Sequence, residues 1–169
     1  MSASVIERLE SRDDPVNKTV PILYFFCSYK NPDKNTCLAI LRTLLWQLIL
    51  NDDELVPYIY DQYTRGPQPP ERNRCQVMLT TAIEAATKTG ERLYIVIDGL
   101  DELPVAERKL FAPILKKFLS EKPLSEAIAM FVASQDLDDI RKTMSTKYRG
   151  CLKIHSMHIG KKVGYRPRG

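Results

Sequence analysis

The sequence predicts an α/β protein in which helices cover a parallel β-sheet in a three-layer arrangement. Three runs rich in apolar, β-branched and aromatic residues have the composition of strands that are covered on both faces. They are residues 20–27, 93–97 and 127–133. Helical segments separate these runs. Because parallel strands need long crossover connections, the alternation of strand and helix indicates parallel pairing.

Apolar periodicity and capping residues predict helices between and around these strands. In chain order, the expected helices lie over residues 2–10, 37–49, 53–63, 75–88, 104–119 and 136–144. Thr36 is a suitable N-cap for the second of them. Pro104 fits the first position of the fifth, whereas Pro113 is expected to kink or divide that helix. A last strand is expected at 151–154.

Composition excludes several classes of protein. The 169 residues are 44% hydrophobic and 27% charged, which is the balance of an ordinary globular protein. No apolar run reaches the ~18 residues that cross a bilayer, and the N-terminus lacks the features of a secretory signal. We therefore expect a cytoplasmic protein without a membrane span. The four cysteines lack the spacing of zinc or redox motifs and are expected to be buried free thiols.

The charge of the chain is mildly positive and unevenly distributed. A net charge of +4 is too small to imply nucleic-acid binding by itself. Residues 160–169 hold four basic groups and no acidic one, and they are expected to form a disordered tail. Residues 1–159 are expected to form one domain. A nucleic-acid binder that works through the tail would show strongly salt-dependent binding, and we regard nucleic acid as an unlikely partner.

The sharpest functional signal is the acidic turn after the second strand. Asp98 follows residues 93–97, at the carboxyl end of a buried strand, where open α/β sheets bind ligands. A carboxylate there can hold hydrated Mg²⁺ beside phosphate oxygens, and Gly99 keeps the approach clear. Asp101 or Glu102, on the turn, could orient or deprotonate a water that attacks a terminal phosphate. A solvated acidic turn that caps the next helix would carry the same residues.

At this motif the chain resembles a known family. The apolar strand followed by residues 98–103 is similar to the Walker B motif of NACHT-type signalling ATPases, which belong to the STAND class of P-loop NTPases. More narrowly, it resembles the fungal nephrocystin-3-like N-terminal domains. Residues 22–30 and 40–48 are similar to the second strand and following helix of those domains, and 131–134 to their next strand. The resemblance covers residues 2–154.

The resemblance implies a nucleotide-binding signalling domain with a P-loop NTPase-like sheet. ATP and Mg²⁺ would bind between a phosphate loop and the Walker B acids, and nucleotide exchange would switch a receptor between resting and oligomerising states. Asp98 would be the magnesium residue, and Asp101 or Glu102 the acid that positions water. Ser134 and the adjoining Gln135 would contact the nucleotide.

Two departures from the family pattern limit the expected activity. The phosphate loop G-x-x-x-x-G-K-[ST] is absent, because only Gly160 precedes a lysine, and the family's first strand is expected to be missing with it. Family members often carry an arginine where this chain has Gln135, which gives no charge stabilisation. We therefore expect half of the site and no ATP turnover by this chain alone. The open sheet edges predict marginal stability or aggregation.

A non-enzymatic interaction module is the alternative interpretation. In that case the degenerate domain would pair with a full-length relative, or form a homo-oligomer, through its open sheet edge. Such pairing would not require nucleotide.

Overall fold

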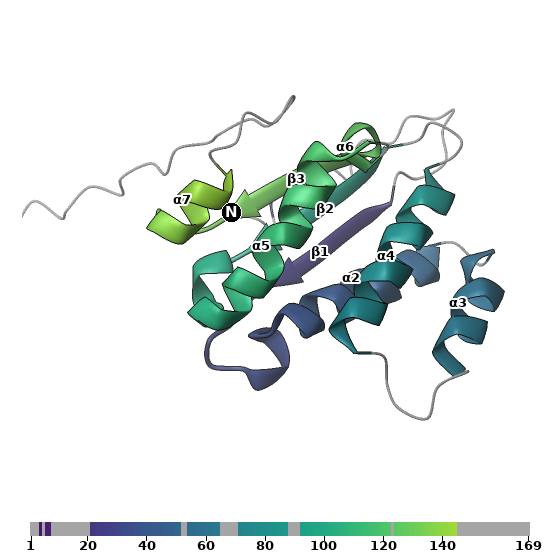
Figure 1. Ribbon diagram of the computed structural model, residues 1–169, viewed down its shortest axis with the longest axis horizontal. Helices are drawn as coiled ribbons and strands as arrows, with labels where there is room; N and C mark the ends of the chain where they lie inside the picture. Colours follow the sequence, from purple (N-terminus) through teal and green to yellow (C-terminus); the bar gives the residue numbers. More distant parts are fainter. Residues whose placement is uncertain are drawn as a thin grey trace, which may run out of the picture.

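Three parallel strands form one sheet at the centre of the molecule (Figure 1). The computed structural model describes residues 4, 6–7, 21–51, 54–64, 71–87, 92–122 and 124–144. Within them the strands lie in the order β1 (Ile22–Phe26), β2 (Leu93–Asp98) and β3 (Ile128–Ala133). The expected α/β class and parallel pairing are thus confirmed. The expected strand at 151–154 and the tail at 160–169 lie outside the described residues.

The register brings the carboxyl ends of the three strands together. β1 pairs with β2 from Ile22 opposite Tyr94 to Phe26 opposite Asp98, and β2 pairs with β3 as far as Asp98 opposite Ala133. Loops that follow the strands therefore leave the sheet side by side at one edge. This edge is where a parallel sheet binds ligands.

The helices occupy the positions that their apolar periodicity predicts, except for the short α6, which was not predicted from the sequence. They are α2 (Cys37–Asn51), α3 (Leu55–Thr64), α4 (Arg72–Ala86), α5 (Val105–Ser120), α6 (Leu124–Ala127) and α7 (Asp138–Met144), with 3-10 turns η1 (Pro32–Lys34) and η2 (Leu100–Glu102). Thr36 is confirmed as an N-cap, because its Oγ1 accepts a hydrogen bond from the amide of Ala39 at 3.1 Å. Of the expected helix at 2–10, Ser4, Ile6 and Glu7 are described, and they are helical.

Pro113 does not divide its helix, so that part of the expectation is wrong. α5 runs without interruption from Val105 to Ser120 with Pro113 inside it. The proline is exposed, so water can reach the backbone carbonyl that its ring leaves unbonded. Buried side chains on both sides of it hold the helix against the core, namely Phe111, Ile114, Leu115 and Phe118. Tertiary packing therefore outweighs the local cost of the proline.

The helices that follow β1 and β2 lie over one face of the sheet. Both crossovers step in the same direction across the sheet, and right-handed crossovers then place their helices on the same side. Figure 1 shows α5 passing over β2 and β3, and α2 beside β1. Leu23, Phe25 and Ile95 on this face belong to the buried core.

The opposite face of β1 is less covered than the sequence predicts. Tyr24 and Phe26 point to that face and are 38% and 37% exposed, although the strand was expected to be buried on both sides. The reason is that the described helices between the strands all lie over the other face. A third layer, if formed by the helix at 2–10, falls almost wholly outside the described residues. Ile6 is buried, with 8% of its surface exposed.

The outer edge of β1 is closed by a side chain. The Gln47 amide on α2 accepts from the Tyr24 N–H at 2.8 Å and donates to the Tyr24 carbonyl at 3.1 Å. A glutamine thus makes the two bonds that a neighbouring strand would make. Among the described residues, β3 has a strand on one side only, and five of its six residues are half-exposed.

Two sequence expectations about thiols and membranes are also addressed by the structure. Cys27, Cys37 and Cys75 are buried and not in disulfides, as expected, while Cys151 lies outside the described residues. In the described part of the chain, no helix has the length and apolar character that a membrane crossing requires.

Candidate functional site

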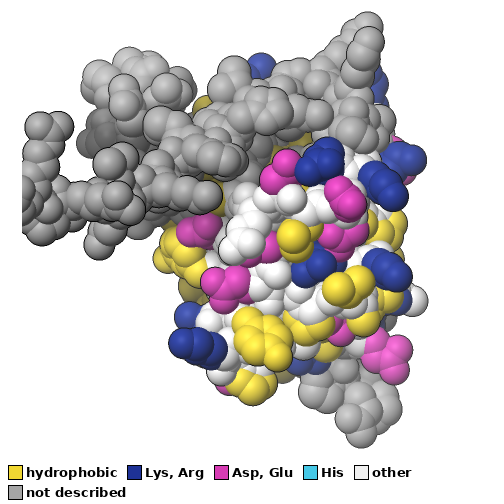
Figure 2. Space-filling model, turned by 90° about the vertical axis from the view of Figure 1, so that its left-hand side faces the viewer, with side chains coloured by type: hydrophobic (Ala, Val, Ile, Leu, Met, Phe, Trp, Pro, Cys, Tyr) yellow, Lys and Arg dark blue, Asp and Glu magenta, His cyan; other side chains and the backbone are white. Residues whose placement is uncertain are grey.

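The loops after the three strands meet at the carboxyl edge of the sheet. The Cys27 amide donates to the Asp98 carbonyl at 2.8 Å, and the Gly99 amide donates to the Ala133 carbonyl at 3.0 Å. These two hydrogen bonds continue the pairing of the sheet by one residue beyond the ends of β1 and β2. Figure 2 views this edge, where acidic, basic and apolar side chains are interspersed.

Gly99 is required by the backbone of the turn. Its φ of +72° lies in the left-handed region, which residues with a Cβ adopt at a cost. A Cβ at this position would lie 3.2 Å from the Cys27 carbonyl oxygen. From the sequence, we expected a glycine here because a side chain would block a ligand. The structure adds a second reason, which is the left-handed backbone conformation of Gly99.

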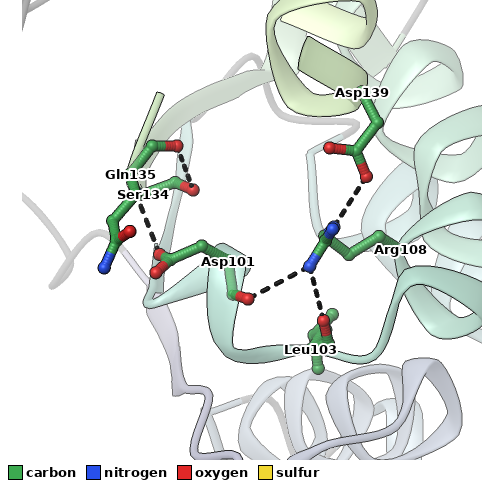
Figure 3. Close-up of polar contacts among 6 residues, drawn as sticks. All are labelled: Asp101, Leu103, Arg108, Ser134, Gln135 and Asp139. Carbon is green, nitrogen blue, oxygen red and sulfur yellow. Dashed lines mark hydrogen bonds and ion pairs between the residues drawn. The ribbon is translucent and has the colours of Figure 1, made fainter. Parts of the chain in front are cut away.

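Asp101 links the acidic turn to the loop after β3. Its Oδ1 accepts a hydrogen bond from the backbone amide of Gln135 at 3.0 Å (Figure 3). The Ser134 hydroxyl donates to the Gln135 carbonyl at 2.9 Å, so its proton is used locally. The structure therefore brings together Asp101, Ser134 and Gln135, three of the residues that the sequence singled out.

Glu102 links the same turn to the loop after β1. Its Oε2 accepts from the backbone amide of Tyr29 at 3.0 Å. The two candidate catalytic acids thus each bind a backbone amide of a neighbouring loop, one on either side of β2. Hydrogen bonds to an ionised acceptor are stronger than neutral ones, so these contacts fix the loops as well as the acids.

Asp98 differs from the other two acids. It is half-buried at the end of β2, and within the described residues its carboxylate is in no hydrogen bond or ion pair. Among the described residues, nothing competes with a ligand for its two oxygens. No group of three or more histidine, cysteine, aspartate or glutamate side chains in the described residues could hold a metal ion by itself.

The negative charge at this edge of the sheet affects the pKa of the neighbouring Cys27 thiol. The pKa of Cys27 is raised to about 12, chiefly by burial and also by the negative charges of Asp98, Glu102 and Asp101. The carboxylates disfavour a further negative charge at this place. By the same reasoning, they favour a cation.

Sequence reasoning missed Arg108, which lies behind the acidic turn. Its Nε donates to Asp139 Oδ2 at 2.7 Å, and its Nη1 donates to the carbonyls of Leu103 at 2.7 Å and Asp101 at 3.1 Å (Figure 3). The Asp139 pKa is lowered, chiefly by the hydrogen bond from Arg108. Arginine and aspartate stand 31 positions apart here, and no sequence spacing links them.

Glu107, next to Arg108, was also missed. Its Oε2 accepts from the amide of Cys37 at 2.8 Å. A carboxylate at the start of a helix satisfies an otherwise unpaired amide and is favoured by the helix dipole. Glu107 therefore anchors the start of α2 against α5.

The comparisons with known proteins agree with one part of the sequence interpretation. The family model described as "Nephrocystin 3, N-terminal" matches residues 1–135, which is most of the 169-residue chain. No curated protein and no solved structure matches the chain. The matched region contains all three strands, the acidic turn, and Ser134 and Gln135 of the loop after β3. The chain therefore belongs to the nephrocystin 3 N-terminal family.

Proposed function

We propose that this chain carries the magnesium-binding half of the nucleotide site of a NACHT-type, STAND-class P-loop NTPase. The observation that carries the proposal is the contrast among the three acids at the carboxyl edge. Asp101 and Glu102 each bind a loop amide, whereas none of the described residues hydrogen-bonds the carboxylate of Asp98, at the end of the central strand. A nucleotide is the proposed ligand, and the cytoplasm, which supplies ATP and Mg²⁺, is the proposed location.

The donor set fits Mg²⁺ only together with a phosphate. This cation keeps several waters and takes one or two carboxylates beside phosphate oxygens, which matches a single available carboxylate better than an all-protein cage would. When bound, Mg²⁺ would neutralise charge on the phosphates. Asp98 would hold it, through oxygens that accept no hydrogen bond from the described residues.

In this proposal Asp101 or Glu102 would orient a water through its second carboxylate oxygen. Their first oxygens bind Gln135 and Tyr29, so the orientation of each acid is set by the backbone of a neighbouring loop. Ser134 and Gln135 stand beside Asp101, where a nucleotide phosphate would contact the end of β3. The phosphate loop is absent from the sequence, so we propose that this chain alone does not turn over ATP.

The test begins with the native transcript. Its 5′ end is mapped, the encoded protein is expressed, and phosphate release from ATP is measured beside the present chain. We expect a glycine-rich loop ending in Lys-Ser or Lys-Thr upstream of Ser2, and release only from the longer protein. Steady release by the present chain, abolished in Asp98→Ala, would contradict the proposal of a half-site. The matched control is Glu121→Gln, which removes a carboxylate at the far end of α5.

A second candidate function, pairing with a partner strand, is favoured by the partial exposure of the apolar strand β3. All six of its residues are apolar, yet five are half-exposed, while β2 at the centre is mostly buried. Gln47 binds the outward backbone groups of Tyr24, in the middle of the β1 edge, so strand addition is less hindered at β3 than at β1. The partner would be an extended strand of a full-length relative or of a second copy.

A matched pair of variants tests this second candidate. The Ala133 carbonyl accepts from β2, so alternation directs the N–H of Met130 away from β2. Met130→Pro removes that outward donor, whereas Met130→Ala removes only the side chain. If β3 recruits a strand, a partner recovered by pull-down without nucleotide is retained by the alanine variant and lost from the proline variant. Equal retention by both would exclude pairing through this edge.

A further inference from the structure

Arg108 makes more contacts than its ion pair with Asp139 alone. Its side chain is 12% exposed, and it faces three oxygen atoms from two different segments. Two are the backbone carbonyls of Asp101 and Leu103, at the end of the turn η2, and the third belongs to Asp139 on α7. Carbonyls at the end of a helical turn lack partners within it, and an arginine can supply them.

The front of the same turn is held by its own carboxylates. Asp101 binds the amide of Gln135 and Glu102 binds the amide of Tyr29. Arg108 thus fixes the backbone from which both carboxylates project. If the backbone shifts, each carboxylate loses the position from which it reaches its amide.

The segment that begins after β3 is attached to the turn at two points. Gln135 binds Asp101, and Asp139, four residues later, binds Arg108. Among the described residues of this segment, Ile140 lies in the core and Leu137 packs against it, so the two polar attachments act beside a small apolar contact. A cavity of about 50 Å³, lined by residues of α5 and α7, lies beside the ion pair.

We infer that Arg108 is a positioning residue that holds the acidic turn in place and couples it to α7 through Asp139. The guanidinium is suited to this role because its donors are rigidly arranged and reach three oxygens at once. A lysine would supply one charge but could not replace all three contacts. What the coupling does for a ligand rests on the proposed function, but the coupling itself is a property of the protein without ligand.

The test follows amide hydrogen exchange by NMR in the full chain without ligand. The reporters are the amides of Gln135 and Tyr29, and their exchange is divided by that of Ile95 in the core of β2. A general loss of stability speeds exchange at Ile95 at least as much as at the two exposed reporters, so it does not raise this ratio. A loss of positioning raises the ratio.

We expect Arg108→Gln to raise the ratio about tenfold at both reporters, the factor that corresponds to losing a hydrogen bond to a charged acceptor. Asp139→Asn leaves the carbonyl contacts in place, so a smaller rise is expected. The control is Lys122→Gln, which removes a cation just beyond the far end of α5 whose partner is Glu126. It leaves the ratio unchanged.

The inference is overturned if Arg108→Gln leaves the ratio within twofold of the wild type, whatever happens to overall stability. Arg108→Lys decides the matter if the glutamine variant does not fold. A raised ratio in the lysine variant supports the inference, and a wild-type ratio overturns it. Because no nucleotide or metal is used, failure here is separate from failure of the proposed function.

Discussion

Replacing Gly99 by alanine tests the geometry of the acidic turn quantitatively. The glycine has φ +72°, and a Cβ would meet the Cys27 carbonyl oxygen at 3.2 Å and the Glu102 Cγ at 3.7 Å. The left-handed backbone costs alanine about 1–2 kcal/mol. The first contact is tight and adds to this, while the second is ordinary van der Waals contact. We expect a total destabilisation of about 2 kcal/mol.

The free energy of unfolding is measured by urea titration and far-UV circular dichroism. Tryptophan fluorescence is a poor probe, because Trp46 is 61% exposed. The alanine variant should also melt about 4–8 °C lower than the wild type, as expected for a domain of this size. If the protein aggregates on heating before it unfolds, the melting temperature is not interpretable, and the lower urea midpoint of the soluble protein is the measurement that counts.

Gly99→Asn separates the two contributions. Asparagine brings the same Cβ but tolerates the left-handed region better than alanine, so it should destabilise the chain by about 1 kcal/mol less. An alanine variant within about 0.3 kcal/mol of the wild type would refute the conformational argument. Equal costs for alanine and asparagine would show that the contact with Cys27, and not the backbone, dominates.

Three further predictions follow from other contacts. Gln47→Ala removes two hydrogen bonds from the edge of β1, and we expect about 1 kcal/mol lower stability in urea and faster aggregation by light scattering. Cys27 and Cys37 both have a pKa raised from 9.0 to about 12, so iodoacetamide at pH 8 should alkylate them about a thousandfold more slowly in the native than in the unfolded chain, as followed by mass spectrometry. The Asp139 pKa lies below its ordinary value of 3.8 when folded, so its ion pair with Arg108 stabilises the protein above about pH 4 and is lost as the pH falls through the folded value. The stability difference between wild type and Asp139→Asn, about 1 kcal/mol at pH 7, should therefore shrink below pH 4 in urea titrations.

Local patterns in the sequence predicted the strands, most helices and the acidic turn. Runs of branched residues and the spacing of leucines are read within one segment, and Thr36 caps α2 as expected. The parallel order also follows, because long helical connections permit it. These features depend on neighbours in the chain, which a sequence displays directly.

Features that depend on distant residues were not predicted. Arg108 meets Asp139 only because α5 and α7 are brought together, and Gln47 reaches the edge of β1 only because α2 packs beside it. The continuity of α5 through Pro113 depends on the core beneath it. In each case, tertiary contacts decide between local possibilities that the sequence leaves equal.

The sequence predicted which residues make up the candidate site, but not the hydrogen bonds among them. Asp98, Asp101 and Gln135 lie at one edge, as the strand pattern requires. That two of the three acids would bind loop amides, leaving Asp98 available, depends on loop geometry. Loop geometry has no periodic signature, so this division of roles came only from the structure.

The most direct test of the account is the magnesium dependence of ATP binding by the native transcript's protein. Binding of a fluorescent ATP analogue is titrated with and without Mg²⁺, in the wild type, in Asp98→Asn and in Glu121→Gln. The account predicts that Mg²⁺ tightens binding in the wild type and in Glu121→Gln, and that Asp98→Asn loses this effect. An undiminished magnesium effect in Asp98→Asn, or the absence of ATP binding in all three proteins, would contradict it.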